Sequence, residues 1–240
     1  MENQPNTALP GAVAVIPCYN AGGRVRPVAE GVLSRLPNLI VVDDGSTDGS
    51  IASLEGLTFQ LVRLPENRGK GHALLAGFRA ALADPAMDCV CALDADGQHD
   101  PAEIPRLVGA FRETGADLVI GSRVFDGAHV PWRSRFGNTL TVTVTAWLLG
   151  RRLPDTQCGF RVLSRAFIED IVASVDGGRY ETEMAIIVKA IREDWRIESV
   201  PIQTIYEKGN ASSHFRKIQD SYRIYRRLIG AARMRPRNSR

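Results

Sequence analysis

Two aspartates separated by one residue close an apolar run near the middle of the chain. Asp94 and Asp96 lie in the stretch Cys-Ala-Leu-Asp-Ala-Asp-Gly-Gln-His, residues 91–99. Carboxylate oxygens in such a place suit Mg²⁺ or Mn²⁺, which are hard cations that keep free positions for substrate phosphates. An acidic pair after a strand can also be a solvated turn. The pair therefore indicates either a metal site for a phosphorylated, nucleotide-linked substrate or an exposed turn.

The elements that would position this pair alternate between strand and helix from residue 12 to residue 120. Short β-branched runs predict strands at Ala12–Ile16, Asn38–Val42, Thr58–Leu64, Met87–Leu93 and Asp117–Ile120. Helical spacing of apolar residues predicts helices at Val25–Leu36, Gly71–Ala83 and Pro101–Arg112. This order predicts an α/β fold, with a Rossmann-like, mostly parallel sheet and helices on both of its faces.

Polar residues follow four of the five expected strands. They lie at Cys18–Ala21, Asp43–Ser46, Asp94–Gln98 and Gly121–Arg123. The carboxyl ends of parallel strands meet at one edge of the sheet, where such folds bind their ligands. The four loops therefore predict one shared site.

The second half of the chain is less regular. Residues 122–138 read as a long loop, and Thr139–Leu149 could be helix or strand. A short strand is expected within Thr156–Arg165, a helix at Tyr180–Arg192 and a strand at Arg196–Ile205. We expect a disordered N-terminus at 1–11, one catalytic domain at 12–212 and a basic amphipathic helix and tail at 213–240.

Composition limits the classes of function. The chain has 240 residues, 44% of them hydrophobic, and a net charge of +3, so no nucleic-acid partner is expected. Its four cysteines form no CxxC pair and read as buried reduced thiols, which favours a cytoplasmic protein. The first residues lack the apolar region of a signal peptide, and the apolar stretch Val142–Leu149 is too short to span a bilayer. We expect a soluble or peripheral membrane protein.

The C-terminal segment is strongly basic. Residues 216–240 hold nine Arg or Lys and a single acid, Asp220. Its apolar residues share one helical stripe: Phe215, Ile218, Tyr222, Tyr225 and Ile229. The segment is predicted either to rest reversibly on an anionic membrane surface or membrane-embedded partner, or to pack on the domain.

Five ordered motifs carry a resemblance to a known family. They are Val-Ile-Pro-Cys-Tyr-Asn at 15–20, Val-Val-Asp-Asp-Gly-Ser-Thr-Asp at 41–48, Asn-Arg-Gly-Lys-Gly at 67–71, Leu-Asp-Ala-Asp-Gly-Gln at 93–98 and Gly-Ser-Arg at 121–123. Together they resemble the family 2 inverting glycosyltransferases, over roughly residues 12–215. The dolichol- or polyprenyl-phosphate mannose and glucose synthases are the most similar branch, which the stretch 155–161 also suits.

The resemblance implies a GT-A fold and a nucleotide-diphosphate sugar donor. Pro17 and Tyr19 would line the nucleoside pocket, and Asp43 and Asp44 would contact the base or ribose. Lys70 between two glycines would lie in a turn that cradles phosphate, although the start of a helix is an equal alternative.

The same resemblance implies a cation and a second phosphate site. Asp94, Asp96 and Gln98 would hold Mg²⁺ or Mn²⁺ against the donor diphosphate, with Ala95 lining the donor. The basic residues expected at the donor or acceptor phosphate are Arg123, Arg135, Arg179 and Lys208. The family usually has Glu where this chain has Ala21, so the sequence leaves GDP and UDP donors open.

The resemblance implies transfer of a hexose, with inversion, to a polyprenyl phosphate at the cytosolic membrane face. A phosphate nucleophile is already an anion and needs no strong base. Transfer to a saccharide hydroxyl would need one, and Glu183 or Glu181 would be the candidate. A non-catalytic nucleotide-sugar-binding subunit is a further alternative. A nucleotidyltransferase is disfavoured because residues 17–21 are not the Gly-rich, Arg-containing loop typical of that class.

Overall fold

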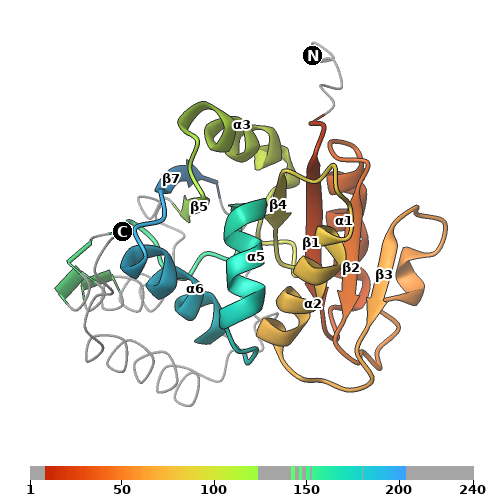
Figure 1. The fold of residues 1–240 in the computed structure, drawn as a ribbon. Coiled ribbons are helices and arrows are strands. Elements are labelled where there is room, and N and C mark those ends of the chain that lie inside the picture. Colours follow the sequence, from red (N-terminus) through yellow and green to blue (C-terminus); the bar gives the residue numbers. More distant parts are fainter. Residues whose placement is uncertain are drawn as a thin grey trace, which may run out of the picture.

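The computed structural model describes residues 9–123, 142–143, 146–147, 150–151, 153–179 and 181–203. Seven strands form one sheet in the order β3-β2-β1-β4-β6-β5-β7 (Figure 1). The strands are β1 (Ala12–Cys18), β2 (Leu39–Asp43), β3 (Gln60–Arg63), β4 (Cys89–Ala92), β5 (Leu118–Arg123), β6 (Arg161–Ser164) and β7 (Ile197–Ile202). All pairs are parallel except those that β6 makes with β4 and β5. The expected α/β fold is confirmed.

Helices cover both faces of the sheet. The described helices are α1 (Val25–Leu33), α2 (Lys70–Leu82), α3 (Ile104–Thr114), α5 (Arg165–Ser174) and α6 (Glu181–Arg192). In Figure 1, α2, α5 and α6 lie in front of the sheet and α1 lies behind it. Gly77 lets α2 approach the sheet closely, since a Cβ there would lie 2.4 Å from Val15 Cγ1. The α5 helix was not expected from the sequence.

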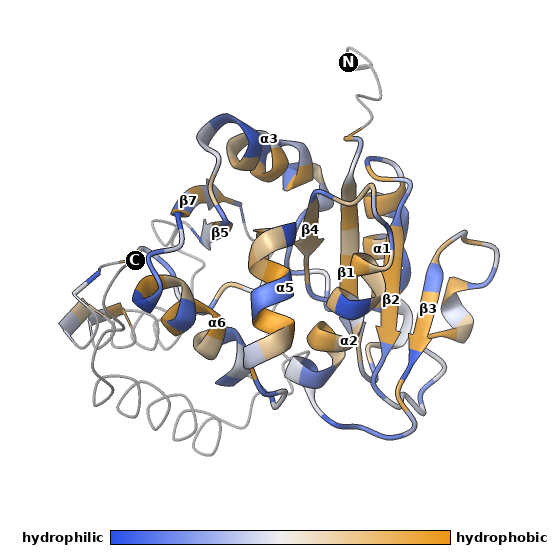
Figure 2. Ribbon diagram, in the orientation of Figure 1, coloured by the Kyte–Doolittle hydropathy of each residue, from blue (hydrophilic) through white to orange (hydrophobic). Residues whose placement is uncertain are grey.

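The centre of the sheet is apolar on both faces. Every residue of β1, β2 and β4 is buried, as continuous β-branched runs predict for strands covered by helices on both sides. Figure 2 shows the same concentration of apolar residues in these central strands. Among the residues that the structure describes, no helix combines the length and the apolar content needed to cross a bilayer.

The antiparallel strand β6 changes which segments reach the site. Arg161, its first residue, pairs with Ala92 at the carboxyl end of β4 and with Ile120 in β5. The segment that precedes β6 therefore arrives at the sheet edge where the parallel strands β1, β2, β4 and β5 end. The expectation of polar loops meeting at one edge extends in this way to residues 155–160.

Candidate active site

The loops after β1 and β2 are held together by hydrogen bonds. The Asn20 backbone N–H donates to Ser46 Oγ at 3.1 Å, and the Thr47 N–H donates to Asn20 Oδ1 at 2.8 Å. The Gly22 N–H donates to Asp48 Oδ2 and Ser50 Oγ. Asn20 has a φ of 47°, in the left-handed region that Asn tolerates better than most residues. The two motifs thus form one rigid wall of the site.

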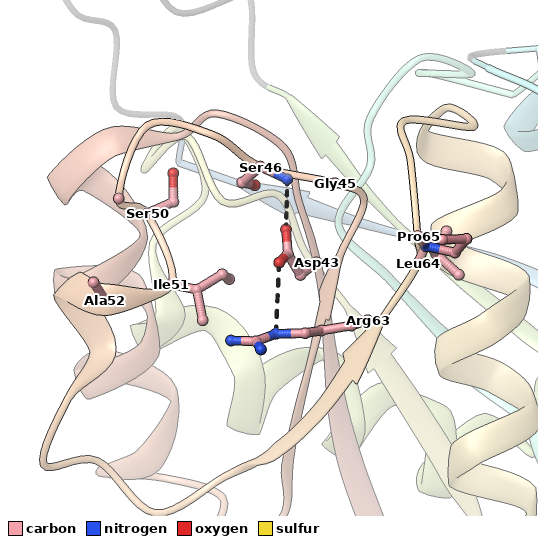
Figure 3. Close-up of a pocket in the computed structure, with 10 residues that line it drawn as sticks. Asp43, Gly45, Ser46, Ser50, Ile51, Ala52, Arg63, Leu64 and Pro65 are labelled. Carbon is pink, nitrogen blue, oxygen red and sulfur yellow. Dashed lines mark hydrogen bonds and ion pairs between the residues drawn. The ribbon is translucent and has the colours of Figure 1, made fainter.

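A cavity of ≈ 340 Å³ opens beside this wall, between the ends of β2 and β3 (Figure 3). Asp43 Oδ1 accepts a hydrogen bond from the Ser46 N–H at 2.8 Å, and Asp43 Oδ2 lies 3.9 Å from Arg63 Nε. Because Arg63 is two-thirds exposed, this ion pair is weak, and the guanidinium and the carboxylate both face the cavity (Figure 3). The cavity therefore offers the Asp43 carboxylate as a hydrogen-bond acceptor and the Arg63 guanidinium as a donor to a polar ring.

Asp44 holds the start of α2 in place. Its two carboxylate oxygens accept hydrogen bonds from the N–H groups of Arg68 and Gly69, both at 2.8 Å. Burial raises the pKa of Asp44, an effect that these backbone donors oppose. The Gly71 N–H at the helix start donates to the Gly178 carbonyl. The motif at 67–71 is thus a helix N-terminus whose backbone donors bind the protein itself.

Asp94 and Asp96 lie just beyond β4. Burial raises the pKa of Asp96 to about 6, and the neighbouring charge of Asp94 adds to the effect. Burial alone would also raise the pKa of Asp94, but the ammonium of Lys70 and further positive groups that include Arg161 together outweigh it and lower that pKa. Two carboxylates that disfavour each other's charge form an environment that a cation would stabilise.

Lys70 supplies a positive charge to Asp94. Its Nζ lies 2.6 Å from Asp94 Oδ1 and 3.1 Å from Glu183 Oε1. Its side chain is 18% exposed and that of Glu183 is 11% exposed, so this ion pair is largely shielded from solvent. The ammonium of Lys70 thus pairs with Asp94, and the carboxylate of Glu183 is its second counter-charge.

His99 supports the backbone of the aspartate pair. Its ring is buried against Phe160, with the ring centroids 5.3 Å apart. Its Nδ1 accepts the Asp94 N–H at 3.4 Å, and its Nε2 lies 3.6 Å from Cys158 Sγ. Burial lowers the pKa of His99 to about 4 and raises that of Cys158 to about 12. Both groups are neutral at physiological pH, and they have structural positions in the site.

Arg123 is bound by an aspartate that the sequence did not single out. Its Nε and Nη2 donate to Asp155 Oδ2 and Oδ1 at 2.6 and 3.1 Å. The Asp155 side chain is completely buried and also accepts the Gln157 N–H at 2.9 Å. The arginine thus ties the end of β5 to the segment before β6.

A second buried arginine binds the same segment to α6. Arg161 is 3% exposed and donates to the carbonyls of Cys158, Glu183 and Thr156 at 2.9, 3.0 and 3.3 Å. Three carbonyl acceptors disperse its charge. The position of Glu183 beside Lys70 therefore depends on Arg161.

The other expected donor-site residues lie at the same edge. Pro17 is within β1, opposite Val42, and Tyr19 follows that strand with 36% of its surface exposed. Ala95 is buried between the two aspartates. The Gln98 N–H donates to Asp96 Oδ1 at 3.0 Å. Arg179 packs on the start of α2, where a Cβ on Gly69 would lie 2.8 Å from its Cγ. Arg135 and Lys208 lie outside the described residues.

The residues missed by sequence reasoning are Asp155 and Arg161. A sequence signal existed for both, because the stretch 155–161 contributed to the resemblance as a whole. Nothing in the spacing indicated their partners, since Asp155 lies 32 residues from Arg123 and Arg161 lies 22 residues from Glu183.

Comparisons with known proteins agree with this architecture. A sequence model of Glycosyl transferase family 2 matches residues 13–172. A polyprenol monophosphomannose synthase of Mycolicibacterium smegmatis is 32% identical over 202 residues, covering 79% of this chain and 76% of that protein. A UDP-N-acetylglucosamine–dolichyl-phosphate N-acetylglucosaminyltransferase of Methanococcus voltae is 25% identical over 236 residues, covering 90% and 93%.

A solved structure shares the fold. Glucosyl-3-phosphoglycerate synthase of Mycobacterium tuberculosis, in complex with Mn²⁺, UDP-glucose and phosphoglyceric acid, superposes with a TM-score of 0.70. The match covers 93% of this chain and 80% of that one at 20% identity, so it establishes the GT-A fold alone. The five motifs, the sheet edge that gathers them and the family match lead to one conclusion: the chain belongs to glycosyl transferase family 2 and is a glycosyltransferase.

Proposed function

We propose that the protein moves a hexose, with inversion and with a divalent metal, from a nucleotide-diphosphate sugar to a polyprenyl (dolichyl-type) phosphate. The observation that carries the proposal is the pair Asp94 and Asp96, partly buried at the carboxyl edge of the sheet beside a lysine ammonium. The acceptor class is supported by the named activities of the relatives from M. smegmatis and M. voltae.

Asp94, Asp96 and Gln98 would hold Mg²⁺ or Mn²⁺. The donor set fits these ions, because it consists of oxygen ligands and Asp94 already binds a cationic group. Within the described residues, no three His, Cys, Asp or Glu side chains form a complete metal cage. The diphosphate of the donor would complete the coordination, and the bound ion would neutralise charge on the departing nucleotide.

The nucleoside of the donor fits the cavity between β2 and β3. Asp43 offers an acceptor to a ring N–H and Arg63 offers donors to a ring carbonyl. Tyr19, beside this wall, presents an exposed aromatic ring for stacking. Ala21 is buried in the core and its methyl side chain supplies no polar contact, so the choice between guanine and uracil falls to the cavity residues.

An acceptor phosphate would be positioned by the basic residues. Arg179, Arg135 and Lys208 are the proposed ligands, and Arg123 keeps the acceptor side in shape through Asp155. The phosphate is an anion at neutral pH and attacks the anomeric carbon from the face opposite the nucleotide, which inverts that carbon. Because Glu183 is the counter-charge of Lys70, its position suits this acceptor better than a hydroxyl that needs a base.

The membrane assignment rests on the basic segment at 213–240, which lies outside the described residues. We propose that it binds the cytosolic face of anionic membranes, while 12–212 forms the catalytic domain. Flotation with anionic vesicles should require this segment, and equal flotation of the full chain and a 1–212 truncation would contradict it.

The test of function is a transfer assay with purified protein, Mn²⁺ and a polyprenyl phosphate, offering GDP-mannose, UDP-glucose and UDP-N-acetylglucosamine in turn. One donor should give a polyprenyl-phosphate sugar, and Asp96→Ala should abolish the product while the surface variant Asp170→Ala retains it. Transfer only to saccharide hydroxyls, with a strict need for Glu183, would indicate the other acceptor class. Donor binding without transfer or hydrolysis would indicate a non-catalytic subunit.

A further inference from the structure

The ammonium of Lys70 lies where three elements of the site converge. Lys70 is the first residue of α2, Asp94 follows β4, and Glu183 is in the first turn of α6. The Nζ atom binds Asp94 Oδ1 at 2.6 Å and Glu183 Oε1 at 3.1 Å, across 113 residues of sequence in the second case. The same carboxylate of Asp94 is one of the three ligands expected for the divalent cation, with Asp96 and Gln98.

The surroundings leave little free space around this contact. A Cβ on Gly159 would lie 2.7 Å from Asp94 Oδ2 and 2.9 Å from Lys70 Nζ. Glycine at this position therefore gives the carboxylate and the ammonium the room to meet. The guanidinium of Arg161 donates a hydrogen bond to the backbone carbonyl of Glu183 and so holds this residue in place. The lysine is thus enclosed by groups that are themselves held in place.

The charges explain why a cation is needed here. Asp94, Asp96 and Glu183 bring three carboxylates into one largely buried region, and Lys70 is the amine that contacts two of them. Contacts of 2.6 and 3.1 Å with two carboxylates favour the charged ammonium form of this amine. Removing the ammonium without replacement would leave these carboxylates to repel one another.

We propose that the ammonium of Lys70 is the counter-cation of Asp94 in the metal-free protein. When the divalent cation binds Asp94, the ammonium leaves Asp94 and stays bound to Glu183. The inference rests on the metal site of the proposed function. It makes Lys70 a competitor of the metal before the donor arrives, and Glu183 the residue that accepts the displaced ammonium. Lys70 and Glu183 are then positioning residues for metal entry.

The first test is Mn²⁺ binding by calorimetry to metal-free protein without any donor. Lys70→Met should bind Mn²⁺ about tenfold more tightly than the wild type, since the metal no longer replaces a charged hydrogen bond. Lys189→Met is the matched control, because Lys189 likewise bridges two carboxylates, Asp170 and Glu193, away from the site. Its affinity should be unchanged. Equal or weaker binding by Lys70→Met would overturn the proposal.

The second test asks whether Glu183 acts through Lys70. Glu183→Gln should weaken Mn²⁺ binding severalfold, because the displaced ammonium loses its other partner. In the Lys70→Met background the same substitution should have little effect, as expected for coupled residues. An equal loss of Mn²⁺ affinity in both backgrounds would refute the exchange. Unchanged or tighter Mn²⁺ binding by Glu183→Gln alone would also refute it. This second result decides the matter even if Lys70→Met does not fold.

The outcomes separate this inference from the proposed function. If neither the wild type nor Lys70→Met binds Mn²⁺ even with GDP or UDP present to complete the coordination, the metal site itself is wrong and both proposals fail. If both bind Mn²⁺ only when the nucleotide is present, the metal site stands and an exchange that precedes the donor is refuted. If the wild type binds Mn²⁺, Asp96→Ala does not, and Lys70→Met binds as the wild type does, the metal site stands and only the exchange is refuted.

Discussion

Replacing Asp155 with asparagine should lower the stability of the protein far more than a surface Asp-to-Asn change. The substitution keeps the shape and the acceptor for the Gln157 N–H, but it removes the buried counter-charge of Arg123. Breaking a buried pair from one side costs about 3–5 kcal/mol. Since the Arg123 side chain is 16% exposed and water reaches it, we expect about 2–3 kcal/mol here.

For a chain of this size, that loss corresponds to a fall in Tm of about 5–10 °C, measured by circular dichroism or calorimetry. Asp170→Asn is the matched control, because Asp170 pairs with Lys189 with 32% of its side chain exposed. It should cost less than about 1 kcal/mol. Arg123→Met should destabilise the protein by itself and add little to Asp155→Asn.

A Tm of Asp155→Asn within about 2 °C of the wild type would refute this reasoning. It would mean that the ion pair between Arg123 and Asp155 does not stabilise the fold. The arginine would then be available to substrate phosphate, as the family resemblance implied. The experiment therefore distinguishes a structural arginine from a substrate-binding one.

Two further predictions concern the aspartate pair. Gly159→Ala should weaken Mn²⁺ binding at least tenfold and lower the calorimetric stability by about 1–3 kcal/mol, since the new methyl group collides with Asp94 and Lys70. Gly109→Ala on α3, where the added methyl group meets open space, should change neither quantity. Wild-type Mn²⁺ affinity in Gly159→Ala would contradict the geometry. Mn²⁺ affinity should rise as the pH increases through about 6, because Asp96 must lose its proton to bind the ion. The affinity at pH 5 should be about tenfold lower than at pH 7. A calorimetric pH series with a midpoint near pH 4 would show that burial does not raise this pKa.

Much of the fold was predictable because it is encoded locally. The strands from Ala12 to Arg123 are short apolar runs that end in polar loops, and all five expected strands are present in the structure with small shifts at their ends. The prediction that the loops share one edge follows from parallel pairing alone. The family resemblance added the GT-A fold, which the comparisons confirmed.

The rest depends on contacts between distant parts of the chain. The four residues of β6 give no signal of their direction, and an antiparallel strand there decides that residues 155–160 reach the site. Lys70 was placed in a phosphate-binding turn or a helix start from its neighbouring glycines alone. Its binding to Glu183 is a tertiary contact that no spacing reveals.

The bidentate contact between Arg123 and Asp155 has a consequence for which substitutions the site can accept. Arg123 ends β5, and Arg161 begins β6 beside that strand, so two arginines hold the segment 155–160 at its two ends. Replacing either arginine alone would leave a buried partner without its donor, Asp155 in one case and backbone carbonyls in the other. The segment beside the aspartate pair is therefore expected to change only when an arginine and its partner change together.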